Sequence, residues 1–166
     1  MKRAAVQASP TFKDAARKAC VPIAAGKGAV KAQYRAAILT SKNVRVVGSV
    51  DMDTAYCAAE PNSARWDYGL GLGLGNGAEW VCWVEPHPAS STSQVAKILA
   101  KLDWLEAKLL QPAFADFAQL TRQAKLNQSL VYVWLYEGAN RISANSREAR
   151  ALALRGVALP KRQVSF

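Results

Sequence analysis

The sequence predicts an α/β protein in which helices cover a central mixed β-sheet on both faces, a three-layer α/β/α architecture with an α-β-β-β-α-β core. Two observations predict it. Runs of β-branched and alternating residues fill the middle of the chain, and segments with helical periodicity lie before and after them. With 166 residues, 51% of them hydrophobic, the chain is long enough for one domain with a substantial core.

The first third of the chain is predicted to contain a basic arm, a helix and a strand. Residues 1–27 have no firm periodicity and contain Pro10 and Pro22, which predicts a basic N-terminal arm with one short helix around residues 11–20. Residues 28–166 are predicted to form the single α/β domain. Residues 30–39 have apolar side chains at helical spacing beside basic ones, and residues 44–52 form a β-branched run typical of a strand.

Two strands, residues 65–74 and 79–85, are predicted to form a hairpin. The turn between them contains Asn76–Gly77, one of the strongest short-range hairpin signals. A three-residue loop, Gly75–Asn76–Gly77, segregates the leucines best and places Asp67 opposite Glu85. A two-residue loop would instead put these two carboxylates on opposite faces of the sheet.

The C-terminal half is predicted to consist of helices around one more strand. Serine and threonine residues at 90–93 offer N-caps to a helix whose apolar side chains recur from Val95 to Leu109. Pro112 permits a second helix to begin, which we expect to end near residue 125, and the apolar run at residues 130–136 predicts a buried strand. Asn145 or Ser146 is expected to cap a last helix that ends at Gly156.

Basic residues are concentrated at the two ends of the chain. Lysine and arginine outnumber aspartate and glutamate by 22 to 12, which gives a formal net charge of +10. Residues 1–50 hold ten bases and one acid (+9), residues 51–137 hold six bases and ten acids (−4), and residues 138–166 hold six bases and one acid (+5). A polyanion is therefore the first partner to expect. The acidic middle argues against a protein that merely coats nucleic acid.

The cysteines and the N-terminal residues indicate a cytoplasmic protein. Cys20, Cys57 and Cys82 are widely spaced and form no CxxC pair, so we expect core thiols in a reducing compartment rather than a zinc site. The first residues include no apolar stretch typical of a secretory signal or a membrane span. An organelle transit peptide is the alternative that the Ala-, Arg- and Lys-rich start leaves open.

Glycine alternates with leucine from Gly69 to Gly77. A dinucleotide-binding loop or a P-loop is excluded, because the glycine spacing is strictly two, no lysine follows and the next element is another strand. The period of two predicts a strand with its leucines toward the core and a bare face opposite them. We expect a neighbouring helix or aromatic side chain to cover that face, and a functional groove is the alternative.

Two carboxylates and a histidine are the candidate functional residues. In the three-residue-loop register, Asp67 and Glu85 face each other about 5 Å apart, and His87 points to the same side. Like charges at that distance repel unless a cation lies between them, and Mg²⁺ binds through one or two carboxylates, water and substrate phosphate. His87 could orient a nucleophilic water or contact phosphate. The alternative is purely structural, with Asp67 ending a strand beside Arg65 and Glu85 hydrogen-bonded to His87.

At these residues the chain resembles the Pro-Asp…(Asp/Glu)-x-Lys nuclease superfamily, the restriction-endonuclease-like fold. Asp67 matches the family's aspartate on the second strand, Glu85 matches the acid on the third, and the order of elements agrees over residues 30–136. The resemblance implies a Mg²⁺-dependent nuclease acting on DNA, less readily on RNA, with Asp67 and Glu85 as metal ligands.

The chain departs from the family pattern at three points. His87 stands where the family has lysine, and Pro86 removes a backbone donor from a strand that the family keeps near the sheet centre. A lysine of the following helix, Lys97 or Lys101, could reach back to the acids, and we choose Lys101 as the auxiliary catalytic residue. The first-helix acid of many members has no counterpart in residues 29–42, and Glu60 is the nearest stand-in.

The basic ends are predicted to hold the phosphate backbone of nucleic acid. The residues predicted for this contact are Lys27, Lys31, Arg35, Arg147 and Arg150. Two other functions remain open at this point: a non-catalytic nucleic-acid-binding or protein-assembly module on the same fold, and a regulatory protein whose basic ends bind an acidic protein. The five tryptophans are expected in the core rather than on a base-stacking surface.

Overall fold

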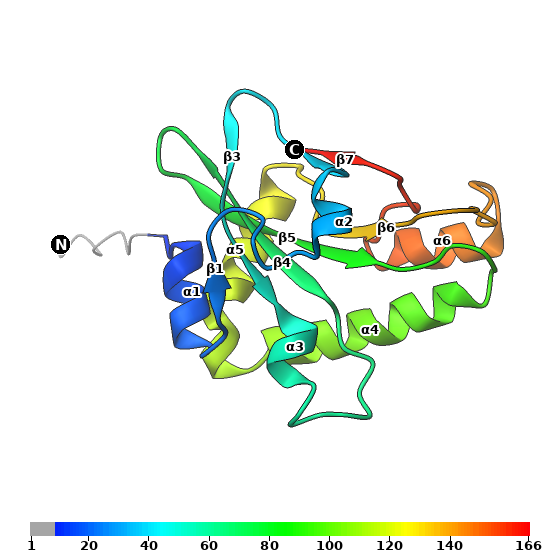
Figure 1. Ribbon diagram of the computed structural model, residues 1–166, viewed down its shortest axis with the longest axis horizontal. Helices are drawn as coiled ribbons and strands as arrows, with labels where there is room; N and C mark the ends of the chain where they lie inside the picture. Colours follow the sequence, from blue (N-terminus) through cyan, green and yellow to red (C-terminus); the bar gives the residue numbers. More distant parts are fainter. Residues whose placement is uncertain (1–8) are drawn as a thin grey trace, which may run out of the picture.

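The computed structural model describes residues 9–166, in which helices alternate with the strands of a twisted sheet (Figure 1). The elements in chain order are α1 (Phe12–Lys18), β1 (Ile23–Ala24), α2 (Ala32–Arg35), β2 (Ile38–Leu39), β3 (Val44–Asp51), α3 (Met52–Tyr56), β4 (Tyr68–Leu74), β5 (Glu79–Pro86), α4 (Gln94–Leu109), the 3₁₀ helix η1 (Pro112–Phe114), α5 (Ala115–Leu126), β6 (Tyr132–Leu135), α6 (Arg147–Leu154) and β7 (Val164–Ser165).

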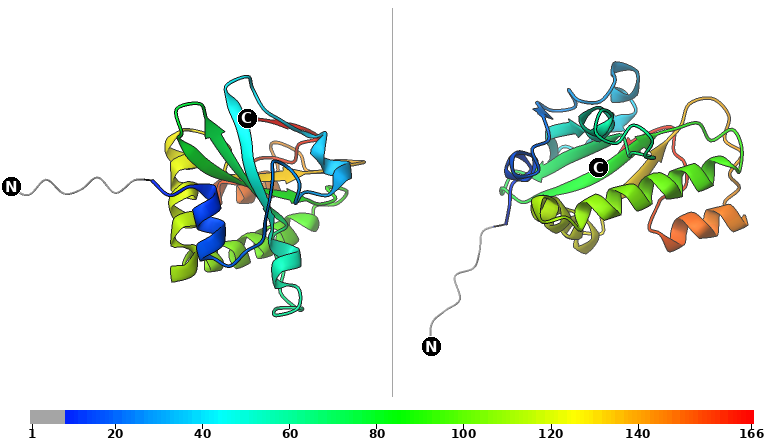
Figure 2. Two further views of the ribbon diagram at one scale, coloured as in Figure 1. Left: turned by 60° about the vertical axis from the view of Figure 1, so that its left-hand side comes forward. Right: turned by 90° about the horizontal axis from the view of Figure 1, so that it is seen from below.

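The five strands of the main sheet lie in the order β1-β3-β4-β5-β6. The first four pair antiparallel, whereas β6 returns parallel to β5 after α4 and α5. The predicted α/β class with a mixed sheet is therefore confirmed. Figure 2 shows α4 and α6 side by side under the sheet, with α2 on the opposite side. In the described part of the chain, that opposite side has no long helix: it has the four-residue α2 and the separate β2–β7 pair.

The hairpin turn adopts the three-residue form that the leucine pattern favours. Leu74 N–H donates to the carbonyl of Ala78 at 2.9 Å, and Gly77 has φ +87°, a left-handed conformation that glycine adopts without strain. The pairing that follows, with Tyr68 opposite Val84 and Gly69 opposite Trp83, confirms the predicted register. Asp67 and Glu85 therefore lie opposite each other at the end of the hairpin.

The bare glycine face of β4 is covered by an aromatic side chain, as expected. A Cβ atom added to Gly71 would lie 2.3 Å from Cγ of Phe12, which is fully buried. Phe12 in turn packs edge-on against Phe117 of α5, with ring centroids 5.5 Å apart. The glycines thus make room for α1 to lie close to the sheet, and this stretch of β4 is not a ligand groove.

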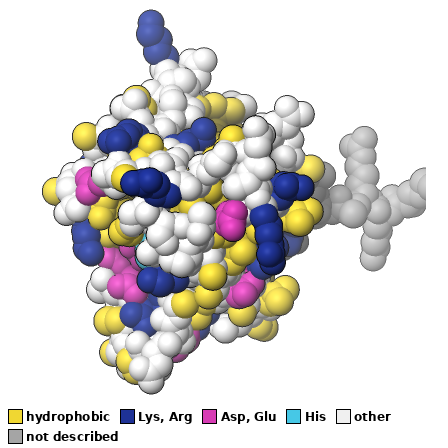
Figure 3. All heavy atoms as spheres, turned by 90° about the vertical axis from the view of Figure 1, so that its right-hand side faces the viewer, with side chains coloured by type: hydrophobic (Ala, Val, Ile, Leu, Met, Phe, Trp, Pro, Cys, Tyr) yellow, Lys and Arg dark blue, Asp and Glu magenta, His cyan; other side chains and the backbone are white. Residues whose placement is uncertain are grey.

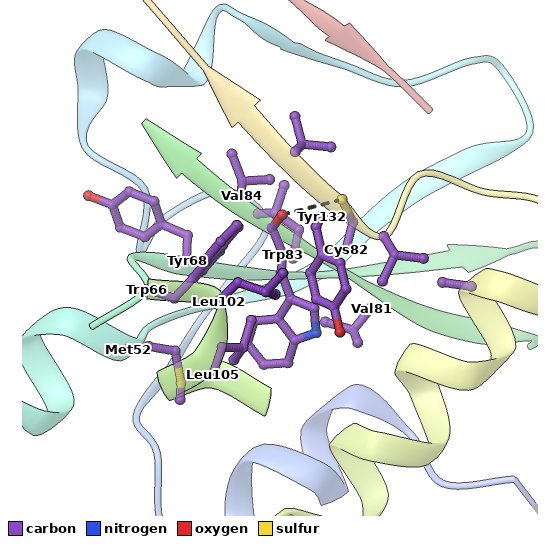
Figure 4. Close-up of a cluster of buried hydrophobic side chains, with 14 of the residues drawn as sticks. Met52, Trp66, Tyr68, Val81, Cys82, Trp83, Val84, Leu102, Leu105 and Tyr132 are labelled. Carbon is purple, nitrogen blue, oxygen red and sulfur yellow. Dashed lines mark hydrogen bonds between the residues drawn. The ribbon is translucent and has the colours of Figure 1, made fainter. Parts of the chain in front are cut away.

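The core lies mainly between β4, β5 and β6 and the helices α4 and α5. Figure 4 shows Trp83 next to Tyr132, with Leu102 and Leu105 of α4 beside the Trp83 ring. The Trp83 indole N–H donates to Thr121 of α5 at 3.0 Å, which satisfies the polar atom of a fully buried ring. The tryptophans at positions 66, 80, 83 and 134 are buried, as predicted, and that at position 104 is partly buried against the core.

The predicted helix over residues 30–39 is wrong beyond its first turn. Only Ala32–Arg35 is helical, and Ile38 already pairs with Val164 in the β2–β7 sheet. Arg35, one of the basic residues of this stretch, donates to the carbonyls of Val30 and Gly28, and Lys27, just before the stretch, donates to those of Arg35 and Ile38. These contacts fold the segment into a compact turn in which a longer helix has no place.

The predicted basic arm is also corrected, because most of its described part belongs to the domain. The short helix expected around residues 11–20 exists as α1, capped by the Thr11 side chain, which accepts from Asp14 N–H at 3.1 Å. Besides Phe12, Ala15 and Ala16 are fully buried, and β1 extends the main sheet. Residues 1–8 of the predicted arm lie outside the described residues.

The cysteines were predicted to be core thiols, and this is correct only for Cys82. Its side chain is fully buried in β5, whereas Cys20 and Cys57 are exposed directly after α1 and α3. Their separation along the sequence carried no information about burial. Among the described helices, none combines the length and apolar character needed to cross a membrane.

Candidate functional site

The hairpin register brings two predicted site residues together. Asp67 directly precedes β4, and Glu85 is the penultimate residue of β5. The backbone N–H of Asp67 donates to Oε2 of Glu85 at 2.8 Å, so this carboxylate spans the end of the hairpin. The contact depends on the three-residue turn at the far end of the hairpin, about 24 Å away along the strands, since a one-residue slip would turn one of the two side chains to the other face.

Lys101, from the middle of α4, lies between the two carboxylates. Its Nζ is 3.0 Å from Oδ1 of Asp67 and also donates a hydrogen bond to Oε1 of Glu85. The apolar residues Ile98, Leu102 and Leu105 are fully buried, and they fix the face of α4 that meets the sheet. Lys101 lies beside this face, which directs its side chain toward the hairpin end.

The three charged side chains differ in their exposure to solvent. The Glu85 side chain is 0% exposed, whereas those of Asp67 and Lys101 are 20% and 19% exposed. A ligand can therefore approach from the side of Asp67 and Lys101. The Glu85 side chain is shielded from solvent, and an ionised carboxylate in such a place requires a positively charged partner.

Burial and charge act in opposite directions at this site. Burial, followed by repulsion from Asp67, raises the pKa of Glu85 well above its usual range, and the nearby ammonium of Lys101 opposes this rise. Burial alone would lower the pKa of Lys101, but the attraction of Glu85 and Asp67 outweighs it and raises that pKa. Lys101 thus stays protonated and is the cation that allows two carboxylates to lie side by side.

His87 lies beside the carboxylates rather than between them. Its Nδ1 is 3.9 Å from Oε1 of Glu85, and its Nε2 is hydrogen-bonded to Oε1 of Gln94 at 2.8 Å. Its carbonyl accepts from the indole N–H of Trp134 at 2.7 Å, which ties this residue to β6. Burial lowers the pKa of His87, so its ring is neutral near pH 7. The ring also borders a small cavity of about 60 Å³ that Tyr34 lines from α2.

Sequence reasoning missed Gln94 and Tyr34. Gln94 is the first residue of α4, and its spacing of seven from His87 matches no motif. Tyr34 comes from a segment that periodicity placed on a regular helix. No pattern in the sequence marks either residue as part of the site.

The carboxylate oxygens of Asp67 and Glu85 suit a hard divalent cation that takes only a few of its ligands from the protein. No group of three or more His, Cys, Asp or Glu side chains able to hold a metal exists within residues 9–166. Two carboxylates that converge on one cationic position are nevertheless the type of donor set with which Mg²⁺ binds when water and substrate phosphate complete its octahedron. Asp67 and Glu85 would be the ligands. The position they share is the one that the ammonium of Lys101 holds.

The other central acids serve elsewhere in the fold. Asp51 caps α3 by accepting from Thr54 N–H at 2.8 Å, and Asp53 pairs with Arg65 at the same distance. Glu60, the candidate for the family's first-helix acid, accepts from the indole of Trp104 at 2.6 Å and pairs with Lys108. These contacts fasten the loop after α3 to α4, so Glu60 does not join Asp67 and Glu85.

The five basic residues predicted to hold nucleic acid divide into two groups. The side chains of Lys27 and Arg35 donate hydrogen bonds to backbone carbonyls, as described above. Lys31, Arg147 and Arg150 are exposed, and their side chains make no hydrogen bond or ion pair with any residue in the described range 9–166. Figure 3 shows one face of the molecule, over which Lys and Arg side chains are scattered with acidic side chains between them.

Comparison with protein-family models, with curated proteins and with solved structures finds no match for this chain. The resemblance to the Pro-Asp…(Asp/Glu)-x-Lys nucleases therefore stays a prediction, carried by the residues and the topology of this chain.

Proposed function

We propose that the protein is a metal-dependent nuclease-like hydrolase that cleaves phosphodiester bonds in DNA, and less readily in RNA, in the cytoplasm. The observation that carries the proposal is the convergence of the Asp67 and Glu85 carboxylates on one ammonium, that of Lys101. The family that the sequence resembles has two acids and a lysine in its active site. Here the lysine would come from α4 instead of the third strand, where His87 stands.

Each residue has a role that its surroundings support. Asp67 and Glu85 would hold Mg²⁺, which supplies Lewis acidity and an activated water when bound. Lys101 would offer its ammonium to the charge that develops on the phosphate oxygens. His87 is neutral and held by Gln94, so it could accept a hydrogen bond from the attacking water or donate one to phosphate.

Nucleic-acid phosphates are proposed to contact the exposed side chains of Lys31, at the start of α2, and of Arg147 and Arg150 in α6, on the other side of the sheet. These three have free donors, whereas Lys27 and Arg35, also predicted for this role, contribute through the turn that they hold together. Phosphate contacts of this kind release counterions, so binding should weaken steeply as salt increases.

Cleavage of supercoiled plasmid and of single-stranded DNA, with Mg²⁺ or Mn²⁺ and after chelation, tests the proposal. We expect D67N and E85Q each to lower the cleavage rate by about 100-fold or more, since each removes a metal-binding charge. K97M is a matched control, because Lys97 is exposed one turn before Lys101 on the same helix and has no ion pair within the described residues. Cleavage that persists in D67N and E85Q, or none in the wild type, would refute the assignment.

A second function is favoured by one specific observation. Lys101 already satisfies both carboxylates, which is also what a purely structural ion-pair cluster would show. A non-catalytic nucleic-acid-binding or protein-assembly module would bind DNA with a steep salt dependence and without metal-dependent cleavage. DNA affinity measured against salt concentration, beside the cleavage assay, separates the two functions. A flat salt dependence would remove nucleic acid as the partner.

A further inference from the structure

Lys101 occupies two of the carboxylate oxygens that could bind a metal. Of the Glu85 carboxylate, Oε2 accepts from Asp67 N–H and Oε1 accepts from Lys101. Of the Asp67 carboxylate, Oδ1 accepts from Lys101 at 3.0 Å. A divalent cation shared by the two carboxylates would therefore compete with the ammonium for Oδ1 and Oε1.

The ammonium cannot simply leave this position. Glu85 has a fully buried side chain, and a buried carboxylate without a positive partner is strongly unfavourable. Departure of Lys101 and arrival of another cation must therefore be coupled. The lysine side chain has a flexible four-carbon stem and is partly exposed, so it can turn outward without movement of α4.

The formal charges favour a particular destination for Lys101. With both carboxylates ionised, the two acids and the ammonium carry one net negative charge. Adding a divalent cation turns this into one net positive charge, with two cations competing for the same oxygens in a partly desolvated site. A phosphodiester group supplies one negative charge and restores neutrality, and it approaches from the open side, where Lys101 lies.

On the basis of the proposed function, we infer that Lys101 has two positions: between Asp67 and Glu85 in the free protein, and on a phosphate oxygen when nucleic acid is bound. Nucleic acid and divalent metal would then bind cooperatively through this side chain. The free protein would hold metal weakly, and the site would become competent only when its polyanionic substrate draws Lys101 out. Because such coupling is reciprocal, metal must tighten nucleic-acid binding by the same factor.

The test is the affinity for Mn²⁺, measured by titration calorimetry with and without a hydrolysis-resistant phosphorothioate DNA oligonucleotide. The D67N/E85Q double variant, titrated with the same oligonucleotide, corrects for metal that the DNA itself binds. We expect DNA to tighten Mn²⁺ binding to the wild-type protein by about 10-fold or more, within the usual range of coupling between sites.

The K101M variant shows how much of this coupling depends on Lys101. A phosphate oxygen can ligate Mn²⁺ in either protein, so we expect some coupling in K101M but at least about fivefold less than in the wild type, and K97M should match the wild type. K101Q serves if K101M does not fold.

The outcomes separate this inference from the proposed function. Equal coupling in wild type and K101M, or wild-type coupling below about twofold, overturns the inference even if the protein cleaves DNA. Failure of the wild type to bind Mn²⁺ under both conditions, together with absent cleavage, overturns both.

Discussion

The contact between Phe12 and Gly71 can be tested by a double-mutant cycle. The Phe12 ring is fully buried on the glycine face of β4, and three of its carbon atoms would lie 2.3–2.7 Å from a Cβ atom at position 71. No real Cβ contact is so short, so G71A must displace the ring. The ring has little freedom to move, because Phe117 of α5 packs against its other side.

The magnitudes follow from these contacts. Removing a buried phenylalanine ring should cost about 3–5 kcal/mol, so F12A is expected to destabilise strongly. G71A alone should cost about 1–3 kcal/mol through overpacking. In the F12A background, the new methyl group enters the vacated space and alanine is preferred over glycine in a strand by about 0.5–1 kcal/mol. G71A should then be neutral or stabilising by up to about 1 kcal/mol, which gives a coupling energy of about 1–4 kcal/mol.

Urea denaturation of the wild type, both single variants and the double variant measures the cycle. Gly75→Ala is the matched control, because Gly75 lies in the exposed turn and its added Cβ would meet no atom within 4 Å. We expect the control to change the free energy of unfolding by less than about 0.5 kcal/mol. Effects of F12A and G71A that add to within about 0.5 kcal/mol would refute the packing of α1 on β4.

Three further predictions concern single contacts. The ion pair with buried Lys108 lowers the pKa of Glu60. The stabilisation from this ion pair is therefore present above pH 4.5, the pKa of Glu60 in the unfolded chain, and is lost as the pH falls through the lower pKa of the folded protein. Urea denaturation should show E60Q about 1–2 kcal/mol less stable than wild type at pH 7, and the stabilities of the two proteins should converge below pH 4.5. Ser146 caps α6 by accepting from Ala149 N–H at 3.0 Å, so thermal melts should show a loss of about 1 kcal/mol in S146A and only a few tenths in S146G. Gly77 has φ +87°, and G77A should cost about 1–2 kcal/mol in the same assay, unlike the neighbouring change at Gly75.

Much of the central fold could be predicted from sequence because it depends on local rules. Strand β3, the β4–β5 hairpin and helices α4, α5 and α6 all follow from periodicity and from turn or cap residues near their ends. The segment from residue 28 to 39 could not be predicted this way. Lys27, which directly precedes the segment, donates to carbonyls eight and eleven residues further along the chain, a pairing that periodicity does not encode.

The candidate site was predictable to the extent that it depends on one hairpin. A three-residue turn and a period of two fix which residues of β4 and β5 share a face, and these local features are sufficient to pair Asp67 with Glu85. The contribution of α4 was less determined. Lys97 and Lys101 lie one helical turn apart, and either could have reached back.

The sequence by itself determined the α/β class, the register of the central hairpin and the meeting of two carboxylates at its end, because strand periodicity and turn chemistry act over a few residues. Only the tertiary structure decided which lysine lies between those carboxylates. The position of the lysine depends on how Ile98, Leu102 and Leu105 of α4 pack against the sheet. It also decided that Phe12 fills the glycine face and that Gln94 holds His87. These contacts join residues far apart in the chain, and packing between elements, which no local pattern specifies, brings them together.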